Sequence, residues 1–158
     1  MTLKILQTNL GRGRRAHDLA YATAKQSNVD ILIVGEPNKK IVDGKKWVTD
    51  GSKDVAILFV NKCLVVTNVE RKKGYLVNKC LVVTNVERKK GYLRVNLGKW
   101  DLYCCYISPN ISIEEYMKLV DEIANQVKTT KREAVIAGDV NAKSHMWESP
   151  KTDSIGEY

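Results

Sequence analysis

The sequence predicts a mixed α/β fold in which helices cover β-sheet. Short apolar runs have the length of buried strands, and two longer segments carry apolar residues at helical spacing. Between them lies a region with the turn signals of an antiparallel meander. The predicted order is β-α-β, a meander and a second β-α-β that ends in a loop, which is the pattern of helices packed on sheet.

The length and composition indicate one globular domain. A chain of 158 residues can bury a substantial core, and its apolar fraction of 44% and charged fraction of 28% are ordinary for a globular protein. It has no apolar stretch of about eighteen residues, so we expect no membrane span. The N-terminus leads directly into a strand pattern with no signal peptide, so we expect a nuclear or cytoplasmic protein that is not secreted.

The first β-α-β unit follows from three segments. Residues 3–8 form an apolar strand, and residues 14–28 are expected to form a helix with Ala16, Leu19, Ala20 and Ala24 near one face. Residues 31–35, Ile-Leu-Ile-Val-Gly, then form a second strand.

Residues 60–76 and 77–93 are identical, an exact tandem repeat of seventeen residues. Repeat architectures need about three diverged copies of longer period, so a recent duplication explains this one better. With one copy, residues 54–59, the repeat and residues 94–97 form three successive antiparallel strands. The extra copy is therefore expected to add a hairpin at the sheet edge or a loop. Threading an odd number of residues straight through would exchange the two faces of the strand.

The net charge of +8 favours a polyanionic partner. Each copy of the repeat has four basic residues and one acidic residue, so without one copy the charge would be +5. Cys63 and Cys80 are the same residue in two copies, and Cys104 and Cys105 are adjacent. None has zinc spacing, and we expect reduced thiols with the adjacent pair facing opposite sides of a strand.

The second β-α-β unit contains the clearest helix signal. Ser112 with Glu115 forms a capping box, and Ile111 with Tyr116 a hydrophobic staple. The apolar positions that follow have helical spacing, with lysines near the expected C-terminus. Strands are expected at residues 102–105 before this helix and at residues 134–137 after it, the latter short and buried.

Polar residues follow these strands at their carboxyl ends, where open α/β sheets bind their ligands. They are Asn9, Glu36, Tyr106, Asp139 and Asn141. Their oxygens suit a divalent cation and a phosphate. Glu36 is the natural Mg²⁺ ligand and Asn9 its neighbour, while Asp139 could orient or deprotonate a water and Asn141 hold a phosphate oxygen.

Each of these residues also has an ordinary structural explanation. Glu36 fits a surface glutamate before a turn, Asn9 fits an Asx turn, and Asp139 with Asn141 fits a strand-ending turn. Tyr106 fits a core tyrosine with a satisfied hydroxyl. Arg12, Arg14 and Arg15 fit either a track for the phosphate backbone or a solvated helix start, and both histidines are expected at the surface.

The set of motifs, in this order, resembles the endonuclease/exonuclease/phosphatase family of deoxyribonuclease-I-like hydrolases. It is most similar to the apurinic-type endonuclease domain of LINE-like, non-LTR retrotransposons. The strings that carry the resemblance are residues 5–10 (ILQTNL), 30–37 (DILIVGEP), 105–110 (CYISPN), 137–142 (AGDVNA), 143–147 (KSHMW) and 152–154 (TDS).

The resemblance implies a two-sheet, four-layer α/β sandwich over residues 1–158 that hydrolyses DNA phosphodiesters with Mg²⁺ or Mn²⁺. Glu36 and Asn9 would hold the metal, and Tyr106, Asp139 and Asn141 would be catalytic. Arg12, Arg14 and Asn110 are further candidates for contacts with substrate phosphate. A reverse transcriptase would be the partner in the full-length element.

The chain departs from the family pattern after Asn141. The family has a serine-aspartate-histidine motif near the end of a longer domain, whereas here Asp153 has no histidine after it. We therefore expect an N-terminal part of the domain with an incomplete second half and impaired activity. Two alternatives are a catalytically inactive relic or weak nucleic-acid-binding fold, and, ranked lower, a sphingomyelinase-like or inositol-phosphatase-like hydrolase.

Overall fold

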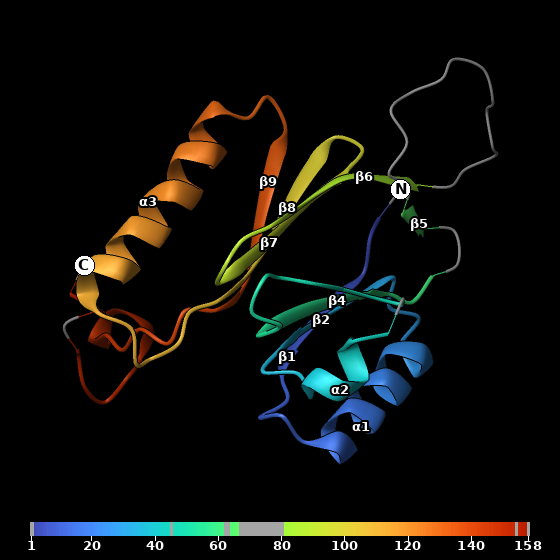
Figure 1. Cartoon of the computed structure of the whole chain (residues 1–158), viewed down its shortest axis with the longest axis horizontal. Coiled ribbons are helices and arrows are strands. Elements are labelled where there is room, and N and C mark those ends of the chain that lie inside the picture. Colours follow the sequence, from blue (N-terminus) through green and yellow to red (C-terminus); the bar gives the residue numbers. More distant parts are fainter. Residues whose placement is uncertain (1, 45, 62–63, 67–80, 154, 158) are drawn as a thin grey trace.

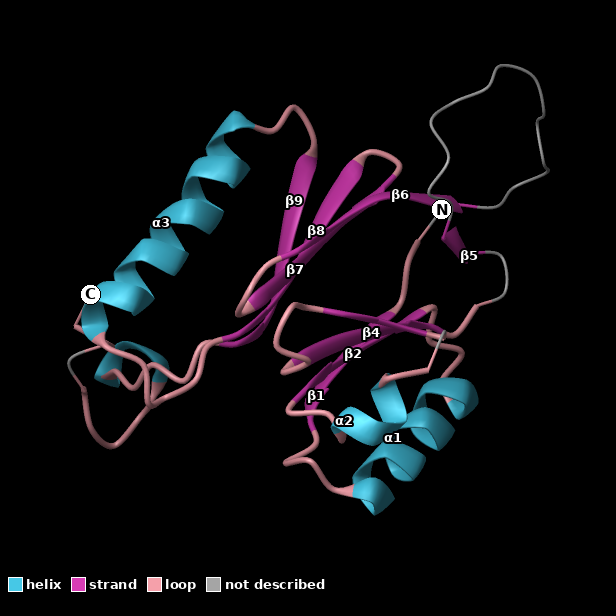
Figure 2. Ribbon diagram, viewed as in Figure 1, coloured by secondary structure: helices cyan, strands magenta, loops and turns pink. Residues whose placement is uncertain are grey.

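The computed structural model describes residues 2–44, 46–61, 64–66, 81–153 and 155–157. They form two β-sheets packed face to face, with helices on both outer faces, so that the predicted four-layer α/β sandwich is confirmed (Figures 1 and 2). The helices are α1 (Arg14–Gln26), α2 (Lys39–Val42), α3 (Ile113–Thr129) and a 3₁₀ turn η1 (His145–Trp147). No helix in this described part is long and apolar enough to cross a membrane.

The first sheet has the strand order β1-β2-β4-β3. The strands are β1 (Ile5–Asn9), β2 (Ile31–Gly35), β3 (Trp47–Thr49) and β4 (Val55–Phe59). β1 and β2 are parallel and linked by α1, as predicted, with Asn9 opposite Gly35. β4 runs antiparallel to β2. The expectation that residues 54–59 begin the meander is therefore wrong, because β4 belongs to the other sheet.

The second sheet has the order β5-β6-β7-β8-β9. Its strands are β5 (Leu64–Val66), β6 (Leu81–Arg88), β7 (Tyr92–Leu97), β8 (Trp100–Tyr106) and β9 (Glu133–Asp139). The meander consists of β6, β7 and β8, with a Lys-Lys-Gly turn between β6 and β7. α3 then links β8 to β9 as a parallel pair.

The two copies of the repeat pair with each other. β5 comes from the first copy and β6 from the second, and their parallel register joins identical residues, Leu64 with Leu81 and Val65 with Val82. The extra copy thus adds a short parallel strand at the sheet edge, where a hairpin or a loop was expected. Lys62, Cys63 and Cys80 of the repeat lie outside the described residues.

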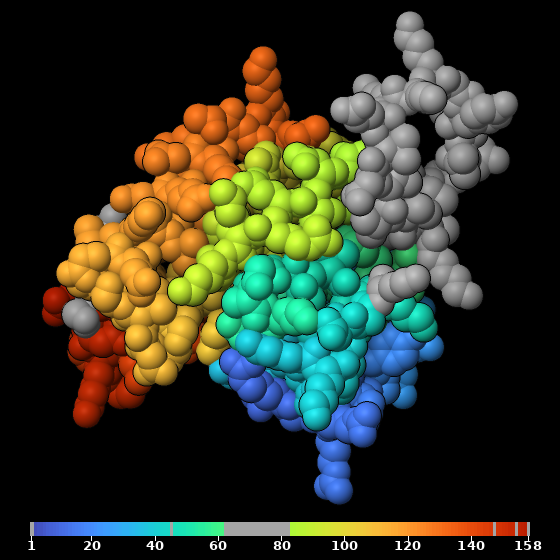
Figure 3. All heavy atoms as spheres, viewed as in Figure 1, coloured from blue at the N-terminus to red at the C-terminus, as the bar shows by residue number. Residues whose placement is uncertain are grey.

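Apolar side chains fill the space between the sheets and under the helices. Ile33 and Ile57 of the first sheet pack against Val95 and Leu102 of the second. The first half of the described chain thus lies directly against the second half, blue to green against yellow-green to red in Figure 3. This contact fixes how the strand ends of the two sheets meet.

The helices cover the outer faces with their apolar sides. α1 buries Ala20 and Ala24 but exposes 69% of Leu19, and His17 is buried in its place, so the prediction was wrong for both residues. α3 begins as predicted, with the Ser112 hydroxyl accepting from the amide of Glu115, and it buries Tyr116.

β9 departs from the expected buried strand. It is the last strand of its sheet, and Ile136 is 58% exposed. On the neighbouring strand, Cys104 packs between the sheets while Cys105 packs under α3, so the adjacent cysteines face opposite sides as predicted. Burial raises the pKa of Cys104, with the neighbouring Cys105 adding to it, and burial raises that of Cys105 to about 12. Both are unreactive thiols.

Candidate functional site

Four strand ends meet at one edge of the sandwich. The parallel strands β1 and β2 end at Asn9 and Gly35, and the parallel strands β8 and β9 end at Tyr106 and Asp139. Two hydrogen bonds join the sheets here. The Tyr106 hydroxyl donates to Glu36 Oε1 at 2.6 Å, and Asn9 Nδ2 donates to Asp139 Oδ2 at 3.2 Å. The structure therefore brings the five residues that follow predicted strands into two contacting groups, Tyr106 with Glu36, and Asp139 with Asn9 and Asn141.

Glu36 has a left-handed backbone with φ of 45°. This conformation costs about 1–2 kcal/mol for a residue with a Cβ. Hydrogen bonds on both sides hold it, because its amide donates to the Asp54 carbonyl at 2.9 Å and its carbonyl accepts from the Arg12 amide at 2.7 Å. The turn after β2 thereby directs the Glu36 carboxylate toward Tyr106.

Tyr106 is a firmly protonated hydrogen-bond donor. Burial raises its pKa to about 12, with further contributions from the hydrogen bond to Glu36 and from the charges of Glu36 and Asp139. The side chain is 7% exposed, so only its edge reaches solvent. A phenol in this state can donate to a phosphate oxygen and remains neutral at physiological pH.

The two asparagines hold the carboxylate of Asp139. Asn141 has a left-handed backbone, its amide donates to Asp139 Oδ1 at 3.0 Å, and its Nδ2 donates to the Ile107 carbonyl at 3.0 Å. The chain therefore turns at Asn141, directly after the strand that ends at Asp139. Asn9 uses its amide oxygen to accept from the Gly11 amide, as an Asx turn does.

Arg12 belongs to the site through Asp54. Its Nη2 lies 3.0 Å from Asp54 Oδ1, and Lys39 Nζ lies 3.2 Å from the same oxygen. Burial raises the pKa of Asp54, but the hydrogen bonds from Arg12 and Lys39 outweigh it and hold the pKa below 3.8. Arg14 and Asn110 are exposed, and neither contacts the four joined side chains among the described residues.

Asp54 and His17 were not among the predicted site residues. Asp54 precedes β4, and because β4 is antiparallel to β2, its start lies at the end of β2. In the sequence, the only indication of Asp54 as a site residue was its position directly before the apolar run of β4. His17 is 5% exposed, and its Nε2 accepts from the backbone amide of Asn38 at 2.8 Å. Asn38 lies two residues after Glu36 in the chain. His145, by contrast, is exposed as predicted.

The donor set suits a hard cation with few protein ligands. Mg²⁺ is commonly bound by one or two carboxylates and completes its shell with water and phosphate. Glu36 and Asp139 supply carboxylates here, Glu36 accepting from the Tyr106 hydroxyl and Asp139 from the Asn9 amide. No cluster of three or more His, Cys, Asp or Glu side chains suited to a metal occurs in the described part of the chain. These residues therefore suit a Mg²⁺ ion that is held by one or two carboxylates and otherwise coordinated by water.

Comparisons with known proteins agree with this arrangement. Residues 100–158, which include β8, α3 and β9, match a protein family described as endonuclease-reverse transcriptase. A search of curated protein sequences found no significant match.

Solved structures share the fold at low sequence identity. The endonuclease domain of TRAS1, a telomere-specific non-LTR retrotransposon, is 19% identical with a TM-score of 0.63, covering 98% of this chain and 68% of that one. An AP endonuclease from Archaeoglobus fulgidus is 18% identical with a TM-score of 0.58, covering 89% and 58%. A humanized D. rerio TDP2 is 14% identical with a TM-score of 0.56, covering 96% and 68%.

The family match covers residues 100–158, whereas the likeness of fold extends over nearly the whole chain. That fold is the two-sheet α/β fold of the deoxyribonuclease-I-like endonuclease/exonuclease/phosphatase superfamily. This superfamily consists of nucleases and phosphodiesterases that generally depend on a divalent metal. The chain spans 58% of the A. fulgidus enzyme and 68% of the other two structures.

Proposed function

We propose that the chain binds DNA at the edge formed by β1, β2, β8 and β9 and supports Mg²⁺- or Mn²⁺-dependent hydrolysis of a phosphodiester, as an endonuclease of retrotransposon origin. The observation that carries the proposal is the pair of contacts between the sheets, Tyr106 with Glu36 and Asn9 with Asp139. They gather two carboxylates, a neutral phenol and a carboxamide from the ends of four separate strands.

Glu36 is the residue that would hold the metal, with Asp139 beside it. A bound divalent cation would supply charge neutralisation at the phosphoryl oxygens. The Glu36 carboxylate is already fixed by its backbone turn and by Tyr106, so little reorganisation is needed to present it. Asn9 acts in this scheme mainly by holding Asp139, because its own amide oxygen accepts from Gly11.

The remaining residues orient water and phosphate. Asp139 has both oxygens held, by Asn9 and by the Asn141 backbone, so its carboxylate has a fixed direction from which to orient an attacking water. Tyr106 donates to a phosphoryl oxygen. Asn141 uses one N–H of its amide on the Ile107 carbonyl, and the second N–H is left for the substrate.

The charge distribution supports DNA as the substrate. The chain has a net charge of +8, and Arg12 and Lys39 lie at the site and neutralise Asp54 there. In the proposed setting of a retroelement, a reverse transcriptase would be the partner that uses the nick.

A nucleic-acid-binding fold with little or no catalysis is the second candidate. It is favoured by the position of the two histidines, since His17 is buried against Asn38 and His145 is exposed, outside the joined side chains. Without a histidine acid/base at the site, we expect hydrolysis to be slower by about 10²–10⁴.

Metal binding is tested by titration calorimetry with Mn²⁺. Glu36→Ala should abolish or strongly reduce the heat, whereas Asp43→Ala, which removes an exposed carboxylate paired with Lys53, should bind as the wild type does. Equal heats for Glu36→Ala and the wild type would remove Glu36 from the site.

Hydrolysis is tested by nicking of supercoiled plasmid with Mg²⁺. Slow nicking that Asp139→Ala abolishes would support the endonuclease. DNA binding with no nicking that depends on Asp139 would favour the second candidate. Rapid nicking abolished by Asp139→Ala would contradict the expectation of impaired activity.

A further inference from the structure

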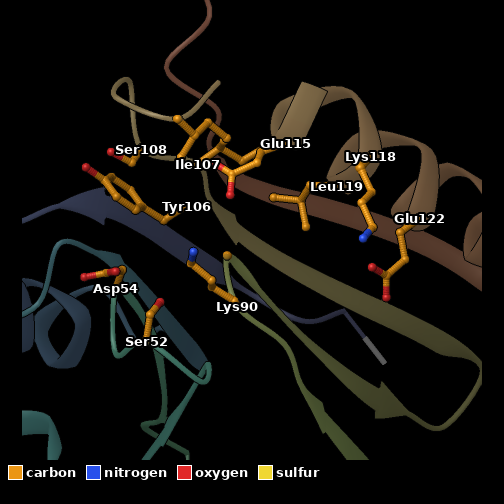
Figure 4. A pocket seen from close by; sticks show the side chains of 12 residues that line it. Ser52, Asp54, Lys90, Tyr106, Ile107, Ser108, Glu115, Lys118, Leu119 and Glu122 are labelled. Atoms are coloured by element: carbon orange, nitrogen blue, oxygen red, sulfur yellow. The ribbon is translucent and has the colours of Figure 1, made fainter. Parts of the chain in front are cut away.

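A cavity of about 300 Å³ opens beside Tyr106, at the junction of the two sheets with α3. Its volume lies at the lower end of the range for ligand pockets, ~300–1,000 Å³. Ile107, Ile111 and Leu119 make up an apolar part of its lining, called the apolar floor below. Figure 4 shows Ile107 and Leu119 together with Tyr106 and the charged side chains that line the cavity. The cavity is therefore continuous with the proposed phosphate site and extends from it toward α3.

The walls of the cavity are tied together by one buried carboxylate. Asp50 is 2% exposed and accepts from the amides of Asp54 at 2.8 Å, Val55 at 3.0 Å and Gly91 at 3.3 Å. It also accepts from the amide and hydroxyl of Ser52. The loop before β4 and the turn between β6 and β7 are thereby held to each other.

Two further backbone contacts fix the same turn. The Gly51 amide donates to the Lys89 carbonyl at 2.9 Å, and the Tyr106 amide donates to the Gly91 carbonyl at 3.0 Å. Gly91 has φ of +91°, and a Cβ there would lie 2.9 Å from Leu119 Cδ2. The turn therefore approaches α3 as closely as a glycine allows, and Lys90 stands between two anchored neighbours.

Lys90 is a cation without a partner in the described part of the chain. Its ammonium group points toward Tyr106 in Figure 4, and no hydrogen bond or ion pair engages it there. The nearby acid, Asp54, is already paired with Arg12 and Lys39. Lys90 thus offers an uncompensated positive charge at the end of the cavity next to the phosphate site.

The far rim carries charges of both signs. Glu115, Lys118 and Glu122 line it from α3, and Glu122 is already engaged, since it accepts from the Tyr92 hydroxyl at 2.9 Å and lies 3.4 Å from Lys89 Nζ. Exocyclic amino groups of a nucleobase donate to carboxylates. Glu115 therefore offers an acceptor for such a donor on the α3 side of the cavity.

We propose that this cavity binds one nucleotide of the substrate strand, adjacent to the phosphodiester held at Tyr106, with Lys90 on its phosphate. The apolar floor packs against the sugar and base, and Glu115 faces the base edge. The proposal rests on the function proposed above, and it adds a defined place for the neighbouring nucleotide.

The first test is fluorescence anisotropy with a labelled single-stranded oligonucleotide in EDTA, so that metal binding does not contribute. Lys90→Ala should weaken binding roughly tenfold, as the loss of one charge-assisted contact does. It should also lower the salt slope by ~0.7. Lys128→Ala is the matched control, because Lys128 is exposed on α3 beyond the pocket. Equal losses for the two variants would overturn the proposal.

The second test needs no variant. Methyl NMR resonances of Ile111 and Leu119 should shift on titration with a trinucleotide, while those of Val29, buried under α1, should not. Unshifted Ile111 and Leu119 methyls in the presence of bound trinucleotide would also overturn it.

Failure of the metal site would be seen separately. Lys90→Ala should keep the Mn²⁺ heat of the wild type, because in the proposal Lys90 contacts phosphate and not the metal. One distinguishing result is a wild type that releases no heat with Mn²⁺ while its oligonucleotide binding still falls in Lys90→Ala. That result would contradict the hydrolytic function and support the nucleotide pocket.

Discussion

Replacement of Gly138 by alanine should displace Asp139 and open the β8–β9 pair. Gly138 precedes Asp139 in β9, opposite Cys105, and has φ of +148°. A Cβ there would lie 2.0 Å from the Cys105 carbonyl oxygen and 2.8 Å from its carbonyl carbon. These are backbone atoms of the neighbouring strand, so no side-chain rotation can relieve the overlap.

The expected loss follows from two contributions. A residue with a Cβ in this backbone region costs about 1–3 kcal/mol. Separating the strands locally forfeits roughly two ladder hydrogen bonds at about 1 kcal/mol each. The total, about 3–5 kcal/mol, is a large part of the ~5–15 kcal/mol typical of a domain.

Urea denaturation followed by circular dichroism measures this loss. Gly11→Ala is the matched control, because Gly11 also has a positive φ, +50°, but a Cβ there would meet no atom within 4 Å. It should lose only about 1–2 kcal/mol. If Gly138→Ala were no less stable than Gly11→Ala, the close approach of β9 to β8 at this residue would be refuted.

Two further predictions concern His17 and the repeat. Burial lowers the pKa of His17 below 6.5, and the charge of Asp18 opposes this shift. The stability contributed by the neutral imidazole is therefore fully present above about pH 6.5. It is lost as the pH falls through the lower pKa of the folded state. Replacing His17 with Gln should flatten the dependence of the urea midpoint on pH below 6.5, the ordinary pKa of the imidazole, and a wild-type slope in the variant would exclude His17 as its source. Deleting residues 77–93 gives the same chain as deleting residues 60–76. The shortened protein should therefore keep the meander, lose only β5 and be as soluble as the wild type or more so. A marked loss of the circular dichroism signal would show that both copies are structural.

The parallel strands and their polar exits could be predicted because the information is local. Residues 5–9 and 31–35 are apolar runs joined by a helix, and such units place both carboxyl ends at one edge. Asn9 and Glu36 follow directly from that rule. Tyr106 and Asp139 follow from the same rule in the second sheet.

Other features depend on contacts that the sequence does not display. β4 looks like a strand of the meander, yet it pairs with β2, because the inner face of the first sheet needs Ile57 to complete it. Asp54 reaches the site only through that antiparallel pairing. His17 has the polarity of a surface residue, but the Asn38 amide and the Trp47 ring, whose centroid lies 5.6 Å away, make its buried position favourable.

The parallel pairing of β5 with β6 joins two copies of the same sequence at the edge of the second sheet. Each residue from Leu64 to Val66 pairs with its own duplicate. These residues begin the repeated sequence Leu-Val-Val-Thr-Asn-Val, which is rich in β-branched residues. β5 is the outermost strand of its sheet, so its outer backbone groups face away from β6. The duplication thus places a strand of repeated sequence at the edge of the sheet opposite β9, away from the candidate site.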